Sequence, residues 1–135
     1  MDAAIRRLVR DRAKDRCEYC QLPQYASEAT FHIEHILAEQ HAPQKVDAPS
    51  NLALACNRCN LNKGPNLSSL DPESGDIVRL FHPRRDSWRE HFAFDGPRIV
   101  GTTPTGRATV QLLKLNAPHR VELRMLLRTA EGFDV

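Results

Sequence analysis

Four cysteines stand in two close pairs, and their spacing carries the clearest chemistry of the sequence. Each pair is a CxxC motif, and 35 residues separate the two motifs, which are formed by Cys17, Cys20, Cys56 and Cys59. Two such motifs can place four thiolates at the corners of a tetrahedron around zinc, which leaves no ligand position open for chemistry. We therefore expect a structural Zn²⁺ site. A thiol redox protein is the alternative, and it is disfavoured because the two pairs satisfy each other as zinc ligands.

Three short elements are expected within and just after the segment that separates the motifs. Residues 31–36, FHIEHI, have the aromatic and β-branched content of a strand, and residues 51–56, NLALAC, predict a second strand. Residues 57–63 are expected to form a helix, because Gly64 can take the left-handed cap position and Pro65 prevents continuation. The predicted order is strand, loop, strand, helix.

An acidic residue, a histidine and two asparagines follow these elements in a fixed order. Glu34 and His35 lie on the first strand, Asn51 comes sixteen residues later, and Asn60 lies nine residues further on the helix. Together with the cysteine pairs, this pattern resembles the HNH endonucleases, and in particular the members that carry two CxxC motifs. The resemblance is specific over residues 17–66 and implies the ββα-metal fold of that family.

The resemblance also implies a role for each of these residues. His35 matches the histidine that acts as general base, and Asn51 matches the asparagine that bonds the backbone across the hairpin and orients this histidine. Glu34 and Asn60 match the two ligands of one catalytic metal, and their oxygen atoms suit Mg²⁺ or Mn²⁺. Many members have Asp and His at these two positions. The implied reaction is hydrolysis of DNA that leaves 5′-phosphate and 3′-hydroxyl ends.

The adjacency of Glu34 and His35 poses a geometric question. Neighbouring residues of a strand point to opposite faces, so the two side chains can share one phosphate only where the strand is distorted. We expect such a distortion near the end of this strand.

Basic residues provide candidates for contacts with DNA phosphates. Lys63 lies three residues after Asn60 on the same helical face, although a solvated lysine in the last turn fits its position equally well. Arg58, Arg84 and Arg85 are further candidates, but such residues more often belong to solvated surfaces. Further arginines recur every fourth residue near the end of the chain, at Arg120, Arg124 and Arg128.

The expected partner is double-stranded DNA, although the net charge of +2 is too small to predict nucleic-acid binding by itself. The alternative function is a zinc-dependent nucleic-acid-binding module whose nuclease site is inert. The complete acid, histidine and asparagine set argues against that alternative, because binding alone has no need of a general base.

The chain of 135 residues is expected to be one nuclease domain of the α+β class. Its composition, with 41% hydrophobic and 27% charged residues, is typical of a folded globular protein. Residues 1–16 are expected to contain a basic amphipathic helix, residues 17–66 the zinc-stapled core, and residues 67–135 an extension of short strands and helices. Neither a signal peptide nor a membrane-spanning stretch is found, so a cytoplasmic location is expected. No oligomeric state is predicted.

Two strands and three helices are expected in the extension. DIVRLF and RIVG have the composition of strands, and RDSWREHF that of a short helix. Residues 106–115 and 117–130 are expected to form two further helices.

Overall fold

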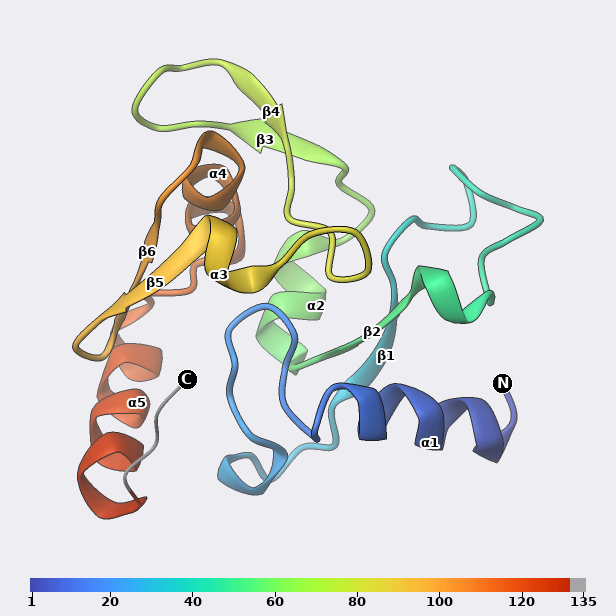
Figure 1. Ribbon diagram of the computed structural model, residues 1–135, viewed down its shortest axis with the longest axis horizontal. Coiled ribbons are helices and arrows are strands. Elements are labelled where there is room, and N and C mark those ends of the chain that lie inside the picture. Colours follow the sequence, from blue (N-terminus) through green and yellow to red (C-terminus); the bar gives the residue numbers. More distant parts are fainter. Residues whose placement is uncertain (132–135) are drawn as a thin grey trace. The chain divides into compact units, whose positions relative to one another are not determined.

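The computed structural model describes residues 1–131, which divide into two compact units (Figure 1). Unit 1 comprises Met1–Pro65 and His82–Asp86, and unit 2 comprises Asn66–Phe81 and the chain from Ser87 onward. Both units contain helices and strands, so the expected α+β class is confirmed. The expected boundary after residue 66 falls beside the change of unit at Pro65. No helix among the described residues is both long and apolar enough to cross a bilayer.

Unit 1 begins with helix α1, Ala3–Arg12, which ends earlier than the sequence predicts. The Asp2 carboxylate caps its first turn by accepting a hydrogen bond of 2.9 Å from the backbone N–H of Ile5. Lys14 and Asp15 then take φ angles of 54° and 55°, in the left-handed region. Two consecutive residues in that region cannot continue an α-helix, which explains its earlier end.

The centre of unit 1 is a hairpin followed by a helix, in the predicted order. Strand β1, His32–His35, pairs antiparallel with β2, Leu52–Ala55, and every residue of β2 is buried. Helix α1 packs against β2 (Figure 1). Helix α2, Asn57–Lys63, has the predicted bounds, and Gly64 ends it with φ 52° and ψ −143°. Its φ is positive as expected, but its ψ lies outside the left-handed helical region.

Two 3₁₀ turns complete unit 1. The first, Gln24–Ala26, follows the first cysteine pair, and the second, Pro49–Asn51, leads directly into β2. The second turn therefore sets where Asn51 lies relative to the hairpin.

The described residues of unit 2 form two hairpins and three helices. The first hairpin pairs β3, Ser68–Leu70, with β4, Ile77–Arg79, and the second pairs β5, Phe92–Asp95, with β6, Arg98–Gly101. The sequence predicted β4 and β6 and missed their partners. The helices are α3, Trp88–His91, α4, Pro104–Leu113, and α5, Pro118–Glu131.

Helix α4 packs against β3, β4 and β6, and two glycines permit its close approach. A Cβ on Gly101 would lie 2.3 Å from the backbone nitrogen of Arg107, and one on Gly106 would lie 2.0 Å from the carbonyl oxygen of His91. Any larger side chain at either position would therefore displace backbone.

Arg124, one of the arginines that recur every fourth residue near the end of the chain, has a structural role on α5. Its side chain is buried and donates hydrogen bonds of 2.6 Å to the carbonyl oxygens of Pro97 and Leu115. It also donates to the side-chain oxygen of Asn116, which in turn accepts from the backbone N–H of Ile99. Arg124 thus ties α5 to the second hairpin and is not a surface charge.

Candidate active site and metal centre

The four cysteines come together in unit 1 as a buried cluster. Their sulfur atoms all lie within 4.8 Å of one another, and none of them forms a disulfide. The Sγ atoms of Cys20 and Cys56 are 3.8 Å apart. A tetrahedron of thiolates about 2.3 Å from zinc has edges of about 3.8 Å, so this separation suits one tetrahedral ion. The cysteines are therefore arranged to hold one metal ion, as the sequence predicted.

Local hydrogen bonds shape both cysteine pairs in the same way. The backbone N–H of Cys20 points at the sulfur of Cys17, and that of Cys59 points at the sulfur of Cys56, each at 3.5 Å. Glu18, inside the first pair, fixes that pair to β2. Its N–H donates to the carbonyl oxygen of Leu54, and its carboxylate accepts from the Leu54 N–H, both at 2.9 Å.

Glu34 is buried on the inner face of β1, beside two donors from other elements. Its Oε1 atom accepts a hydrogen bond of 2.8 Å from the Tyr19 hydroxyl and lies 3.2 Å from the Lys63 Nζ atom. The same Nζ donates to the carbonyl oxygen of Ile36 at 2.8 Å. The other carboxylate oxygen, Oε2, is buried and has no hydrogen-bond partner within the described chain.

Burial and charge act in opposite directions on Glu34. Loss of hydration raises the pKa of this carboxyl group, and the Lys63 ammonium and the Tyr19 hydroxyl oppose that rise. Burial also raises the pKa of the Tyr19 hydroxyl, and the nearby Glu34 charge raises it further. Tyr19 therefore stays protonated and remains a donor.

Asn60 lies on the face of α2 that is turned toward β1. It precedes Lys63 by three residues, which places the two side chains as neighbours on one helical face, and Lys63 reaches Glu34. The Asn60 side chain is half-buried. A carboxylate oxygen without a partner and an amide oxygen are both kinds of ligand that Mg²⁺ or Mn²⁺ prefers.

His35 is half-exposed, whereas its neighbour Glu34 is buried. Its Nε2 atom lies 2.8 Å from a carboxylate oxygen of Asp47, in the loop between β1 and β2. The β1–β2 ladder pairs regularly up to His35 opposite Leu52, and the chain bends at residues 36–37 directly after it, so the departure from strand geometry begins at the end of β1 and not within it. His35 is the last residue of the strand. The sequence analysis missed Asp47, because an aspartate in a polar loop has no distinctive spacing.

Asn51 holds the loop that carries Asp47. Its amide nitrogen donates hydrogen bonds of 2.9 Å to the carbonyl oxygens of Leu37 and Val46, and its amide oxygen accepts one of 2.8 Å from the Leu37 N–H. The side chain is buried. These bonds join the two ends of the loop next to His35, and they are bonds across the hairpin of the kind expected for Asn51.

The basic residues predicted to contact DNA differ in their burial and in their ion pairs within unit 1. Lys63 is 2% exposed, so its description as a solvated lysine is wrong, and its pairing with Glu34 was missed. Arg84 is mostly buried and forms an ion pair with Glu18, and its burial lowers its pKa to about 10, which still leaves it charged at neutral pH. Arg85 is exposed, and Arg58 is half-buried.

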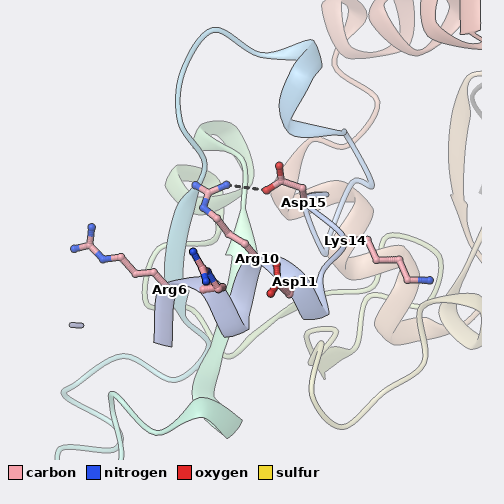
Figure 2. A pocket seen from close by; sticks show the side chains of 6 residues that line it. Arg6, Arg10, Asp11, Lys14 and Asp15 are labelled. Atoms are coloured by element: carbon pink, nitrogen blue, oxygen red, sulfur yellow. Dashed lines mark hydrogen bonds and ion pairs between the residues drawn. The ribbon is translucent and has the colours of Figure 1, made fainter. Parts of the chain in front are cut away.

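A basic groove runs along the exposed side of α1. Its volume is about 560 Å³, and Figure 2 shows its side chains, with Arg10 turned back onto Asp15 at 2.9 Å. The lining residues are Arg6, Arg7, Arg10, Asp11, Lys14 and Asp15. The groove combines four basic with two acidic residues, so its local charge is positive.

Comparison with known proteins finds a match, which lies over the core of unit 1. Residues 17–66 match the family model of the HNH endonucleases. No curated protein and no solved structure matches the chain. The matched segment contains both cysteine pairs, the β1–β2 hairpin and α2, so the resemblance is confirmed over these residues. The match indicates a nuclease-related function that involves nucleic acid.

Proposed function

We propose that this protein is a metal-dependent endonuclease that hydrolyses phosphodiester bonds in DNA. The observation that carries the proposal is the buried Oε2 atom of Glu34, which has no partner within the described chain and lies inside the segment that matches the HNH family. A buried acceptor without a donor is costly, by roughly 1–3 kcal/mol, and a bound cation would satisfy it.

Two metal sites with different roles belong to this proposal. The four cysteines would hold Zn²⁺ as a structural ion, because a complete thiolate tetrahedron leaves no open position. Glu34 and Asn60 would hold Mg²⁺ or Mn²⁺ through oxygen atoms. Such an ion, when bound, offsets the negative charge that develops on the phosphate and on the leaving oxygen.

His35 would act as the general base. The Asp47 carboxylate accepts from Nε2–H, which holds the ring in the tautomer whose Nδ1 atom is free to take a proton from the attacking water. Asn51 fixes the loop that carries Asp47, and so helps to hold Asp47 in place beside His35. The half-exposed position of His35 at the end of β1 leaves room for a phosphate from outside.

DNA in its double-stranded form is the proposed substrate, and the products would carry 5′-phosphate and 3′-hydroxyl ends. Arg85 and Arg58 are the proposed phosphate contacts, whereas Lys63 and Arg84 are held by carboxylates of unit 1. We further propose that the whole chain works as one nuclease domain in the cytoplasm.

One observation favours a second function. The Lys63 ammonium lies 3.2 Å from Glu34, so the protein itself already supplies one positive charge beside this carboxylate. A site balanced in this way could persist without a catalytic ion. The second candidate is therefore a zinc-dependent nucleic-acid-binding module with an inert nuclease site.

Cleavage of supercoiled plasmid by purified protein with Mg²⁺ or Mn²⁺, against a chelator control, tests the proposal. We expect His35→Ala to retain its fold, its zinc and its DNA affinity, and to cut roughly 10²–10⁴-fold more slowly, which is the usual contribution of a general base. His119→Ala, which changes an exposed histidine of α5, is the matched control and should cut like the wild type.

The outcomes separate the two functions. Equal cleavage by wild type and His35→Ala would mean that the active site lies elsewhere. No cleavage of any DNA by the wild type with either metal, together with intact binding, would favour the binding module. A variant Asn60→Ala should need more Mg²⁺ for the same rate, because an oxygen ligand is lost while the base remains.

A further inference from the structure

The first cysteine pair encloses a residue that points out of the zinc cluster and into the second site. Tyr19 lies between Cys17 and Cys20 and is fully buried. Its hydroxyl donates a hydrogen bond of 2.8 Å to the Oε1 atom of Glu34. Tyr19 therefore links the two sites. Its backbone belongs to the first cysteine pair, and its hydroxyl contacts the carboxylate that would hold the catalytic ion.

The hydrogen bonds of Glu34 are divided unequally between its two oxygen atoms. Oε1 receives the Tyr19 hydroxyl and lies beside the Lys63 ammonium, whereas Oε2 receives no donor from the described chain. Rotation of a glutamate carboxylate about its last bond is broad, so the side-chain torsion alone does not fix the plane of the carboxylate. Tyr19 and Lys63 together hold that plane, so that one oxygen meets both of them and the other is left for a ligand.

The position of Tyr19 is itself set by the first cysteine pair. The Cys17 N–H donates to the carbonyl oxygen of Leu22, and the Gln21 N–H returns to the carbonyl oxygen of Cys17, both at 2.9 Å. Gln21 takes a φ of 66°, which turns the chain sharply within this loop. A metal ion on the cysteines would hold the same loop from its other side.

We propose that Tyr19 is a positioning residue that orients Glu34 for the catalytic divalent cation and thereby makes occupancy of that site depend on the zinc site. This inference rests on the proposed function, because it takes Glu34 as a metal ligand. Residues that hold a metal ligand in place typically contribute 10–100-fold to metal affinity. Zinc would then organise the chemistry as well as the fold.

Mn²⁺ binding to the zinc-loaded protein, followed by the electron paramagnetic resonance signal of free Mn²⁺, tests the inference directly. Tyr19→Phe removes only the hydroxyl. We expect this variant to keep one zinc per chain and a thermal transition close to that of the wild type, and to raise the Mn²⁺ dissociation constant by roughly 10–100-fold. Tyr25→Phe, at an exposed tyrosine, is the matched control and should bind Mn²⁺ like the wild type.

Cleavage adds a second readout that a purely structural role would not give. Excess Mn²⁺ should restore the rate of Tyr19→Phe, because the ion is bound more weakly but reacts in the same way. Excess Mn²⁺ should not restore His35→Ala. An unchanged Mn²⁺ dissociation constant in Tyr19→Phe would overturn the inference and leave the proposed function standing. A wild type that binds no Mn²⁺ beyond its zinc would overturn both.

A measurement on the wild-type sequence covers the case in which Tyr19→Phe does not fold. The chain has only two tyrosines, so labelling with 3-fluorotyrosine gives two fluorine resonances, which Tyr25→Phe assigns. We expect saturating Mg²⁺ to shift the Tyr19 resonance and to leave the Tyr25 resonance in place. A Tyr19 resonance that Mg²⁺ does not move would overturn the inference.

Discussion

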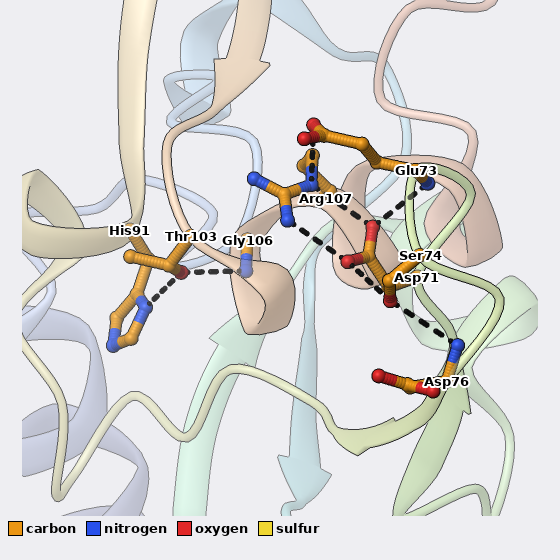
Figure 3. Close-up of polar contacts among 8 residues, drawn as sticks. All are labelled: Asp71, Glu73, Ser74, Asp76, His91, Thr103, Gly106 and Arg107. Carbon is orange, nitrogen blue, oxygen red and sulfur yellow. Dashed lines mark hydrogen bonds and ion pairs between the residues drawn. The ribbon is translucent and has the colours of Figure 1, made fainter.

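Two buried carboxylates, one in each unit, face a cationic side chain and yet differ in how their oxygen atoms are used. In unit 2, Asp71 accepts from the Arg107 Nε atom and the Glu73 N–H on one oxygen, and from Arg107 and the Ser74 hydroxyl on the other, all at 2.9–3.0 Å (Figure 3). In unit 1, Glu34 has all its donors on one oxygen.

The two pKa values move in opposite directions for this reason. The hydrogen bonds of Arg107 hold the pKa of Asp71 well below its usual range, whereas burial raises that of Glu34. A carboxylate with every acceptor position used can only support the fold, and Asp71 fixes the β3–β4 turn to α4. A buried carboxylate with donors on only one of its oxygens is a candidate ligand site. The family match covers Glu34 and ends before Asp71.

Removal of zinc should have the largest effect on the stability of the protein. Among the described residues, only unit 1 contains a cysteine cluster. We expect Cys17→Ser or Cys59→Ser to unfold the protein, since structural zinc contributes roughly 10–16 kcal/mol in apparent terms. Circular dichroism follows the loss of structure, and elemental analysis should find about one zinc per chain in the wild type. Well-folded protein without zinc would contradict the prediction.

Lys63→Met should have the next largest effect, and its size should depend on pH. The variant leaves the Glu34 charge buried without its cation, which costs about 3–5 kcal/mol. The pKa of Glu34 is already raised, and loss of Lys63 raises it further, so Glu34 becomes neutral at a higher pH than an ordinary glutamate. The loss of stability should therefore be large at pH 8 and smaller at pH 5.5.

Urea unfolding of the zinc-loaded protein at the two pH values measures this difference. Lys45→Met, which changes an exposed lysine, is the control and should cost little at either pH. Mn²⁺ should stabilise Lys63→Met more than it stabilises the wild type, because the ion supplies the missing charge. Equal losses at pH 8 and pH 5.5 would mean that Glu34 is not the group that Lys63 balances.

Asp71→Asn should lower stability by an amount that does not change over the same pH range. A folded pKa below the unfolded value of about 3.9 gives stability that is fully present above that value and is lost only at lower pH. Between pH 5.5 and pH 8 the Asp71 contribution is therefore constant. Asp76→Asn, at an exposed position of the same turn, is the control for urea unfolding. A pH-dependent loss would remove the contrast with Glu34.

Local patterns in the sequence identified the elements and the zinc cluster. The end of α2 follows from Gly64 and Pro65, which act on the backbone next to them. The two CxxC motifs define their own geometry, and Asn51 lies directly before β2, at the end of the turn Pro49–Asn51. Features of this kind depend on neighbours in the chain, and the structure agrees with them.

Contacts between distant residues could not be predicted in the same way. The Tyr19 hydroxyl meets Glu34 across 15 positions, and Lys63 meets Ile36 across 27 positions. The positions of Tyr19 and Lys63 in the sequence do not indicate which residue each will contact. Strand β3 has three residues and β5 has four, and each is stabilised by its hairpin partner rather than by an apolar pattern of its own.

Arg84 and Arg85 form a similar contrast between a side chain that is paired and one that is exposed. Their replacement should have the smallest effect of those predicted here. Both were predicted to contact DNA phosphates. The Arg84 guanidinium is held by the Glu18 carboxylate and is mostly buried, whereas Arg85 is exposed. If a guanidinium that is paired with a carboxylate supports the fold and an exposed one is available to a phosphate, Arg85 is the one of these two that contributes to DNA binding.

Fluorescence anisotropy with a labelled duplex between 50 and 200 mM salt separates the two arginines, in a His35→Ala background that slows cleavage. A phosphate contact contributes about 0.9 to the slope of log affinity against log salt. Arg85→Ala should therefore flatten the slope by about that amount and weaken binding to all sequences alike. Arg84→Ala should leave the slope unchanged and lower the urea midpoint, because Glu18 loses its partner. A flatter slope in Arg84→Ala would show that its ion pair opens on DNA, and an unchanged slope in Arg85→Ala would assign it to a solvated surface.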